Sequence, residues 1–416
     1  MTLLKTSLLS FIATACRLLS GLVVNKAAAI YLGPMGLALV GQLQNFIQIA
    51  MTFAQGGLNT GITKYVAEYK SNENKISLLF STAARISLAT SITVGAFLTL
   101  LSKMISLYVL KNGEYYYIFM IFGVTIFFFV CNNLLLSVLN GLKEVKTWTI
   151  ISISQSFLGL ILTTTLIKLM NLEGVLLALV LNQSATFLVV IMLLKNHSQI
   201  KPRLFFLKCS NEEAKKLAKY SLMTLSSAIV IPISHFSVRE YLGKTLSWEE
   251  AGYWQAICYI SNMYLMVVTT TLSTYYLPRL SEISCKHKLR VEIFSACKIV
   301  LPTILIASSF VFFLRDFIIL LLFSPDFLPM RDLFLWQLAG DVVKLLAWLF
   351  AYVMLAKAMM KTFILTEIIF SLCFIGMAMI FVETYGLVGT SYAFVVNYTL
   401  YLIVVVFFTR KEWSHG

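Results

Sequence analysis

The chain has 416 residues, of which 59% are hydrophobic and only 12% are charged, with a formal net charge of +14. A soluble domain carries roughly 25% charged residues, so this composition excludes a soluble chain and, with it, the nucleic-acid-binding function that a basic chain would otherwise suggest. Many apolar runs reach the ~20 residues that a helix needs to cross a ~30 Å hydrocarbon layer, which predicts an all-α polytopic membrane protein.

In chain order, these apolar runs predict twelve transmembrane helices. Their approximate bounds are Ser7–Tyr31, Leu37–Gly61, Leu78–Leu101, Tyr115–Leu139, Trp148–Leu169, Gly174–Leu194, Tyr220–Leu242, Ala251–Leu277, Ile293–Leu314, Leu333–Ala356, Thr362–Val382 and Leu387–Phe408. The basic segment 195–219 follows the sixth helix. We therefore predict an N-terminal six-helix lobe at 1–194, a cytoplasmic linker at 195–219 and a C-terminal lobe at 220–416.

The second of these helices carries a polar stripe. We predict that the stretch Leu37–Tyr69 is a membrane-spanning helix that loosens near its far end, at Gly56-Gly57. Five polar side chains share one face at ~100° per residue, namely Gln44, Gln48, Thr52, Gln55 and Asn59. Neighbouring helices could absorb such amides by hydrogen bonding. Five polar groups on one face favour a water-filled cavity instead.

Lysine and arginine are distributed unequally between alternate loops. The side that contains the N-terminus has 22 of them and the opposite side has 7. Because positively charged loops stay in the cytoplasm, this asymmetry predicts that both termini are cytoplasmic.

The two halves of the sequence resemble each other at a constant offset of 215 residues. Lys146-Thr147 matches Lys361-Thr362, Gly174 matches Gly389, and Asn182 matches Asn397. Six helices per copy give both copies the same orientation in the membrane. The pattern thus predicts two pseudo-symmetric lobes around a central cavity, an architecture found in transporters.

Several cations lie inside predicted helices. Inserting a charged side chain near the centre of a membrane helix costs roughly 2.5–3.5 kcal/mol of free energy. Arg17 and Arg85 have no acidic residue within four positions, whereas Lys344 follows Asp341 by three residues. Asp341 and Lys344 could form a local ion pair without a substrate role. Unpaired cations in a transporter indicate an anionic substrate, and arginine suits phosphate because its planar fork binds two oxygens at once.

Two further positions, Lys26 and His235, are each open to two interpretations. Lys26 lies near the outer end of the first helix, where it could bind substrate or extend its ammonium to the membrane surface. His235 and Arg239 lie one helical turn apart after Pro232. His235 could respond to protons, although a lone histidine in an apolar helix is more often a hydrogen-bonded structural residue.

Motifs for enzymatic chemistry are absent from the sequence. It has no G-x-S-x-G, no Walker A motif, no H-E-x-x-H and no C-x-x-C pair among its seven cysteines. We therefore predict a transporter without catalytic residues, metal or cofactor. Proton or sodium coupling stays open.

Five segments together resemble one known family along essentially the whole chain. They are Leu32–Leu37, Gly61–Tyr69, Ser247–Gln255, Tyr276–Ser281 and Met330–Lys344. They are similar to the enterobacterial flippases for lipid-linked oligosaccharides of O-antigen and common-antigen assembly, in the polysaccharide-transport branch of the multidrug/oligosaccharidyl-lipid/polysaccharide exporter superfamily. The resemblance implies a cationic central cavity that carries undecaprenyl-pyrophosphate-linked oligosaccharide from the cytoplasmic to the periplasmic leaflet of the inner membrane.

The resemblance also assigns residues. The family is generally basic in the middle of the first helix, here at Arg17, and Lys26, Lys64 and the Asp341/Lys344 pair fall on matching positions. Arg85 matches no family motif. The polar stripe, the intramembrane cations and the resemblance together give these substrate-binding candidates: Arg17, Lys26, Gln44, Gln48, Gln55, Asn59, Lys64, Arg85, Arg239 and Lys344. A coupling or structural role is expected for Asp341, Lys344 and His235.

Two other functions stay open at this point. A drug or organic-ion antiporter of the same superfamily would be expected to have acidic residues in its cavity. A membrane enzyme of the same pathway, such as a polymerase or an acyltransferase, is the other alternative, but a polymerase usually has a large periplasmic loop and none is predicted. Membrane lipids and other membrane proteins of polysaccharide assembly are the further partners that we expect.

Overall fold

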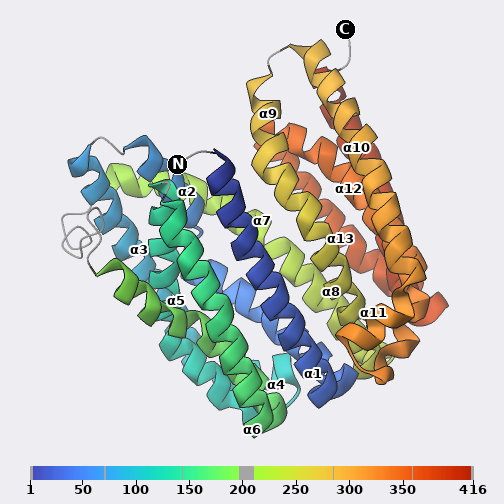
Figure 1. Ribbon diagram of the computed structural model, residues 1–416. Coiled ribbons are helices and arrows are strands. Elements are labelled where there is room, and N and C mark those ends of the chain that lie inside the picture. Colours follow the sequence, from blue (N-terminus) through green and yellow to red (C-terminus); the bar gives the residue numbers. More distant parts are fainter. Residues whose placement is uncertain are drawn as a thin grey trace. The chain divides into compact units, whose positions relative to one another are not determined.

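The computed structural model describes residues 3–69, 72–142, 144–195, 210–283, 285–357 and 359–413, which are nearly all helical (Figure 1). Within these ranges, seven stretches are long and apolar enough to cross a membrane: Ile12–Ala54, Asn74–Leu100, Gly113–Gly141, Val145–Leu194, Lys286–Phe313, Pro325–Ala356 and Met360–Trp413. The chain is therefore a multi-pass helical membrane protein. Helices α7 and α8, where we predict the seventh and eighth spans, are not among these seven stretches.

The chain divides into two compact units. Unit 1 consists of Met1–Leu32 and Leu39–Pro232. Its elements are α1 (Leu3–Ala54), α2 (Asn59–Glu68), α3 (Glu73–Leu100), α4 (Ser102–Leu110), the 3-10 turn η1 (Gly113–Tyr115), α5 (Tyr116–Gly141), α6 (Val145–Leu194) and the first part of α7 (Asn211–Thr245). Helix α5 is central to this unit, since it packs against α2, α3, α4 and α6.

Unit 2 consists of Gly33–Ala38 and Ile233–Gly416. Besides the end of α7, its elements are α8 (Trp248–Thr271), the π-helical turn η3 (Leu272–Tyr276), α9 (Leu277–Glu282), α10 (Lys286–Phe313), α11 (Arg315–Leu322), the 3-10 segment η4 (Pro325–Leu333), α12 (Phe334–Ala356), α13 (Met360–Tyr385), η5 (Gly386–Val388) and α14 (Gly389–Trp413). Here α12 has the central position, because it packs against α8, α9, α10, α13 and α14.

Single residues with positive φ divide the longest helical stretches. Gly33 (φ 64°) breaks α1, Asn171 (φ 48°) breaks α6, and Gly386 (φ 60°) separates α13 from α14. Glycine adopts this left-handed region without steric strain, and asparagine is among the few other residues that tolerate it. Asn171 and Gly386 are 215 positions apart, which is the offset of the sequence repeat.

The prediction of one helix from Leu37 to Tyr69 is wrong in its middle. Helix α1 ends at Ala54, and α2 begins only at Asn59. Gly56 (φ 62°) and Gly57 (φ 65°) occupy the gap, and both lie in a backbone region that is incompatible with a helix. Glycine adopts this conformation without steric strain because it has no Cβ. The polar stripe is therefore divided between two helices.

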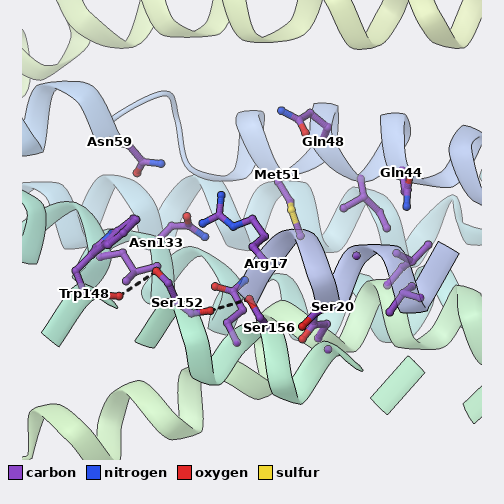
Figure 2. A pocket seen from close by; sticks show the side chains of 18 of the residues that line it. Arg17, Ser20, Gln44, Gln48, Met51, Asn59, Asn133, Trp148, Ser152 and Ser156 are labelled. Atoms are coloured by element: carbon purple, nitrogen blue, oxygen red, sulfur yellow. Dashed lines mark hydrogen bonds between the residues drawn. The ribbon is translucent and has the colours of Figure 1, made fainter. Parts of the chain in front are cut away.

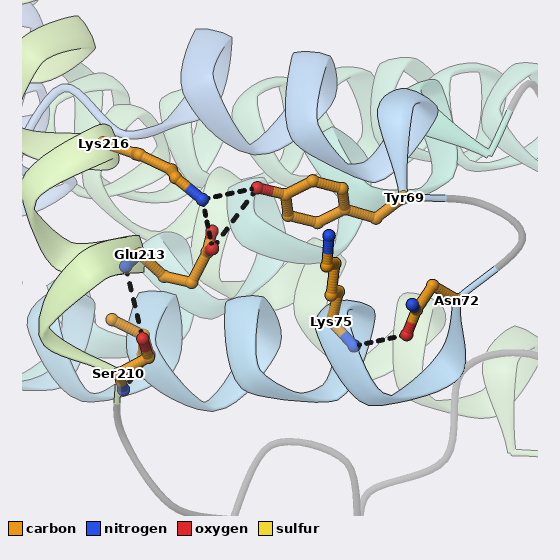
Figure 3. A network of polar contacts seen from close by, with 7 residues as sticks. Tyr69, Asn72, Lys75, Ser210, Glu213 and Lys216 are labelled. Carbon is orange, nitrogen blue, oxygen red and sulfur yellow. Dashed lines mark hydrogen bonds and ion pairs between the residues drawn. The ribbon is translucent and has the colours of Figure 1, made fainter.

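The first turns of α7 are attached to α2 and α3 by a polar network (Figure 3). The Tyr69 hydroxyl donates to Glu213 Oε1 at 3.3 Å, and Lys216 Nζ donates to the same carboxylate oxygen at 2.7 Å and to the Tyr69 hydroxyl at 2.9 Å. Ser210 N donates to the Thr82 hydroxyl at 3.1 Å. Hydrogen bonds to the carboxylate and the phenol raise the pKa of Lys216 above its ordinary value. These contacts fix the start of α7 within unit 1.

Candidate functional site

Unit 1 encloses a polar cavity with a volume of about 1220 Å³. Its walls come from both arms of α1, on either side of Gly33, and from α2, α5 and α6. This volume exceeds the roughly 300–1,000 Å³ of a typical small-molecule pocket. The cavity can therefore hold a guest larger than a drug-sized ligand.

Helical periodicity explains how α6 presents polar groups to this cavity. On α6 the lining residues Trp148, Ser152, Gln155, Gly159 and Thr163 follow one another at steps of four, three, four and four, which keeps them on one face. Sequence reasoning missed this stripe. The same periodicity test that finds the stripe after Leu37 would have found it.

The chemistry of the lining is cationic and rich in amides. Among the described residues that line the cavity, Arg17 and Lys64 are the cations, and none is Asp or Glu. Nine lining residues carry amides: Asn25, Gln44, Asn45, Gln48, Asn59, Asn133, Asn140, Gln155 and Asn182. Seven carry hydroxyls: Ser20, Thr60, Thr63, Ser137, Ser152, Ser156 and Thr163. Such a surface suits a guest that combines negative charge with many hydrogen-bonding groups.

Arg17 is the cation in the middle of the cavity. Its side chain is exposed, and none of the ion pairs between described side chains involves it. Figure 2 shows it projecting between the α1 arm that carries Gln48 and the α6 wall that carries Ser152 and Ser156. Lys64, the second cation, has its ammonium 5.2 Å from the centroid of the Tyr65 ring. The guanidinium of Arg17 is thus available to an anionic guest.

The structure brings together half of the predicted substrate-binding residues. Gln44, Gln48 and Asn59 line the cavity with the two cations. Gln55 lies in the gap between α1 and α2 and does not line it; instead its Oε1 accepts a hydrogen bond from Asn59 Nδ2. Thr52, the remaining member of the stripe, donates to Gln48 O at 2.7 Å and does not line the cavity either.

Two predicted cations of unit 1 lie elsewhere. Lys26 is half-buried on α1, and Arg85 is exposed on α3, and the cavity lining includes neither side chain. Arg85 and Arg17 look alike in the sequence, because both lie in apolar helices without an acidic neighbour. Only the packing of α3 and α1 distinguishes them.

The remaining candidates belong to unit 2, where Asp341 and Lys344 are held separately. The fully buried Asp341 accepts a hydrogen bond from the Tyr264 hydroxyl at 2.7 Å. The Lys344 ammonium lies 5.2, 5.5 and 5.3 Å from the ring centroids of Trp348, Phe394 and Tyr398. The described side chains form no salt bridge between the two, so the local ion pair that we considered is replaced by a hydrogen-bonded carboxylate and a cation–π cage.

Arg239 and His235 are also enclosed in unit 2. Arg239 is 1% exposed, its Nη2 donates to Gln255 Oε1, and its guanidinium lies 5.6 Å from the centroid of the Trp254 ring. The imidazole of His235 packs against the same indole in a tilted arrangement, with 5.3 Å between the ring centroids. The Trp254 indole thus packs against both side chains.

These features define a class of protein: a multi-pass helical membrane protein with a cationic, amide-rich cavity. The chain belongs to the family of polysaccharide biosynthesis proteins, whose model matches residues 3–284. It is 32% identical over 406 residues, which is 96% of each chain, to the lipid III flippases of Escherichia coli (strain K12) and Shigella flexneri.

Solved structures show the same fold. The chain superposes on an inward-facing multidrug resistance MATE family transporter of the MOP superfamily with a TM-score of 0.81 and 17% identity, covering 96% of this chain and 94% of the other. For a MOP superfamily transporter from Pyrococcus furiosus, the TM-score is 0.73 at 17% identity, covering 99% of this chain and 96% of the other. At such identities the likeness concerns the fold alone.

Proposed function

We propose that the chain is a flippase that moves undecaprenyl-pyrophosphate-linked oligosaccharide from the cytoplasmic to the periplasmic leaflet of the bacterial inner membrane by alternating access. The cavity of unit 1 carries this proposal, since it combines two cations, nine amides and no acidic side chain among its described lining residues. A pyrophosphate needs cationic donors, and an oligosaccharide needs many neutral hydrogen-bonding partners. The flippases of Escherichia coli and Shigella flexneri support the same substrate class.

Within this proposal, Arg17 binds the pyrophosphate. It is the cation that projects into the cavity from an otherwise apolar helix, and a guanidinium can bind two phosphate oxygens at once. Lys64 adds a second positive charge from α2. A cation at membrane depth carries an unfavourable free energy of insertion. Bound phosphate would reduce this penalty, whereas in a vacant cavity only hydration reduces it.

The proposed architecture has twelve transmembrane helices in two pseudo-symmetric six-helix lobes around a central pathway. Three of the seven apolar stretches contain a residue with positive φ, and two of these residues, Asn171 and Gly386, are separated by the repeat offset. In this topology both termini and the linker 195–219 are cytoplasmic. Reporter fusions at Gly416 and near Ser210 test it, because a periplasmic signal at either point would contradict the assigned sides.

Complementation of a flippase-deficient strain tests the function itself. A strain that lacks the chain should accumulate a lipid-linked oligosaccharide, and expression of the chain should clear it and restore the surface polysaccharide. A drug antiporter of the same superfamily would change the resistance of the cell to toxic cations and leave the lipid unaltered. Restored drug efflux without clearance of the lipid would overturn the proposal.

A further inference from the structure

Two hydroxyl groups of the α6 wall can offer a guest only a hydrogen-bond acceptor. The Ser152 hydroxyl donates to Trp148 O at 2.9 Å, and the Ser156 hydroxyl donates to Ser152 O at 3.0 Å. A serine hydroxyl has one hydrogen, so both groups have already used their donor within the helix. What each of them can still offer a guest is an oxygen lone pair.

The hydroxyls of α2 and α5 follow the same rule. Thr63 Oγ1 donates to Ser137 O at 3.2 Å, and Ser137 Oγ donates to Asn133 O at 2.8 Å. Both side chains line the cavity. Phosphate oxygens carry only lone pairs at neutral pH, so these four hydroxyl oxygens cannot hydrogen-bond to them. Such a surface suits a neutral guest that is rich in O–H or N–H donors.

A further acceptor lies where the two arms of α6, before and after Asn171, pack against each other. Asn182 lines the cavity, and its buried Oδ1 has no hydrogen-bond partner among the described residues. Gly159 leaves the space for this amide, because a Cβ at that position would lie 2.6 Å from Asn182 Nδ2. A buried oxygen without a donor is unfavourable, and a donor on a bound guest would remove that penalty.

Trp148 completes this wall with an aromatic surface. Its side chain is half-buried, lines the cavity and lies at the start of the stripe that continues through Ser152 and Ser156 (Figure 2). An indole ring offers a wide apolar face, and the C–H face of a sugar ring is the apolar surface that fits it. The donors of the same sugar ring are its hydroxyl groups.

We propose that Trp148, Ser152, Ser156 and Asn182 form a saccharide subsite, separate from the phosphate-binding Arg17. A pyranose ring packs against the Trp148 indole, and its hydroxyl groups donate to the acceptor oxygens of the α6 wall. This subsite rests on the flippase function proposed above. It specifies that the α6 wall recognises the saccharide part of the substrate. It makes Trp148 a specificity-determining residue.

Binding to two lipids tests the subsite. The purified full-length protein in detergent is titrated with undecaprenyl pyrophosphate and, separately, with the lipid-linked oligosaccharide extracted from a strain that lacks the gene. The wild-type protein should bind the glycosylated lipid more tightly. Trp148→Ala should weaken that binding by about tenfold and leave the binding of undecaprenyl pyrophosphate unchanged. Trp148→Phe should retain most of the affinity, because it keeps an aromatic face.

Matched variants keep the result interpretable. Ile150→Ala changes an exposed residue of α6 that does not line the cavity, and it should bind both lipids like the wild type. Ser156→Ala tests the acceptor wall without touching the indole and should weaken only the glycosylated lipid, so the test does not depend on the folding of Trp148→Ala.

The possible outcomes separate the two proposals. Equal loss for both lipids in Trp148→Ala, or no loss for either, would overturn the saccharide subsite. If the wild-type protein bound the two lipids equally, the subsite would again be wrong while the flippase proposal stood. Binding of neither lipid by the wild-type protein would instead count against the flippase function.

Discussion

Arg17 in unit 1 and Lys344 in unit 2 each lie within an apolar helix, yet their surroundings differ. Arg17 is exposed in a cavity of about 1220 Å³ and forms no ion pair with a described side chain. Lys344 lies among three aromatic rings at 5.2–5.5 Å. A cation that the protein itself surrounds is stabilised without a guest, whereas a cation in an open cavity is available to one. We therefore propose that substrate binds in unit 1 and that the unit 2 cluster has a structural role.

The largest expected effect is at Arg17. Arg17→Ala should abolish or strongly impair transport, because a charge-assisted hydrogen bond contributes roughly 1.5–3 kcal/mol, and its loss weakens binding by about tenfold or more. Folded yield should stay normal, since removal of a costly intramembrane charge does not hinder insertion. Arg17→Lys should keep part of the activity and Arg17→Glu none. Surface polysaccharide and protein level are measured together.

Arg85 provides the matched control for this experiment. It is also an arginine in an apolar helix of unit 1, but it is exposed on α3 and does not line the cavity. Arg85→Ala should therefore transport at a level close to that of the wild type. Two results would contradict the proposed role of Arg17. One is full transport by Arg17→Ala at normal protein level, and the other is an equal loss of transport in Arg17→Ala and Arg85→Ala.

The second prediction concerns what the two units share. A Cβ at Gly174 in unit 1 would lie 2.0 Å from Leu166 O, and a Cβ at Gly389 in unit 2 would lie 2.2 Å from Phe381 O. Because the obstacle is backbone in both cases, Gly174→Ala and Gly389→Ala should each destabilise the protein by about 1–3 kcal/mol. The readout is the apparent melting temperature in detergent.

Gly376 is the control for these substitutions. It lies within α13, and a Cβ there would meet no atom within 4 Å. Gly376→Ala should leave the melting temperature unchanged or raise it slightly, since alanine is favoured over glycine in a helix interior. If Gly174→Ala and Gly389→Ala changed the melting temperature as little as Gly376→Ala, the close backbone approach at Gly174 and Gly389 would not contribute to stability.

The third prediction tests whether the unit 2 cluster is structural. Lys344→Met should keep near-normal folded yield and clearly more transport than Arg17→Ala, because a thioether packs well among aromatic rings. Asp341→Ala should lower stability by about 1–3 kcal/mol, since it leaves the Tyr264 hydroxyl buried without its acceptor. Adding Tyr264→Phe to Asp341→Ala should recover part of that loss. Strictly additive losses, or a transport-dead Lys344→Met at full yield, would argue for a direct role in transport.

The sequence was sufficient to predict where the helices lie, because apolar runs of membrane-spanning length admit few alternatives to a helix. It failed in the stretch after Ala54, where Gly56 and Gly57 both take positive φ. Side-chain periodicity cannot show such a break. The glycine pair was visible, but its conformation depends on close packing, since a Cβ at Gly57 would lie 2.7 Å from Ser221 O.

The site was predictable only in part for a related reason. Arg17, Arg85 and Lys344 are all cations within apolar runs, and in the sequence only the nearby Asp341 distinguishes Lys344 from the two arginines. Their difference lies in contacts between distant residues: the rings of Phe394 and Tyr398, fifty and more positions beyond Lys344, form most of its cage. Local patterns carry no information about such partners. The stripe on α6, in contrast, is a local pattern and could have been found.

The smallest expected effect concerns Lys216, a cation of unit 1 that is neither in the cavity nor enclosed by rings. It is paired with Glu213 and Tyr69, which raise its pKa. A raised folded-state pKa means that the stabilisation is fully present below the unfolded value of about 10.4 and is lost only as the pH rises further. The difference in melting temperature between wild type and Lys216→Met should therefore be small and constant from about pH 7 to pH 9, and should shrink above about pH 10.5. Lys215→Met, at the exposed neighbouring position, should show no difference at any pH. A Lys216 effect that disappeared between pH 7 and 9 would mean that this network does not hold the ammonium as the contacts in Figure 3 indicate.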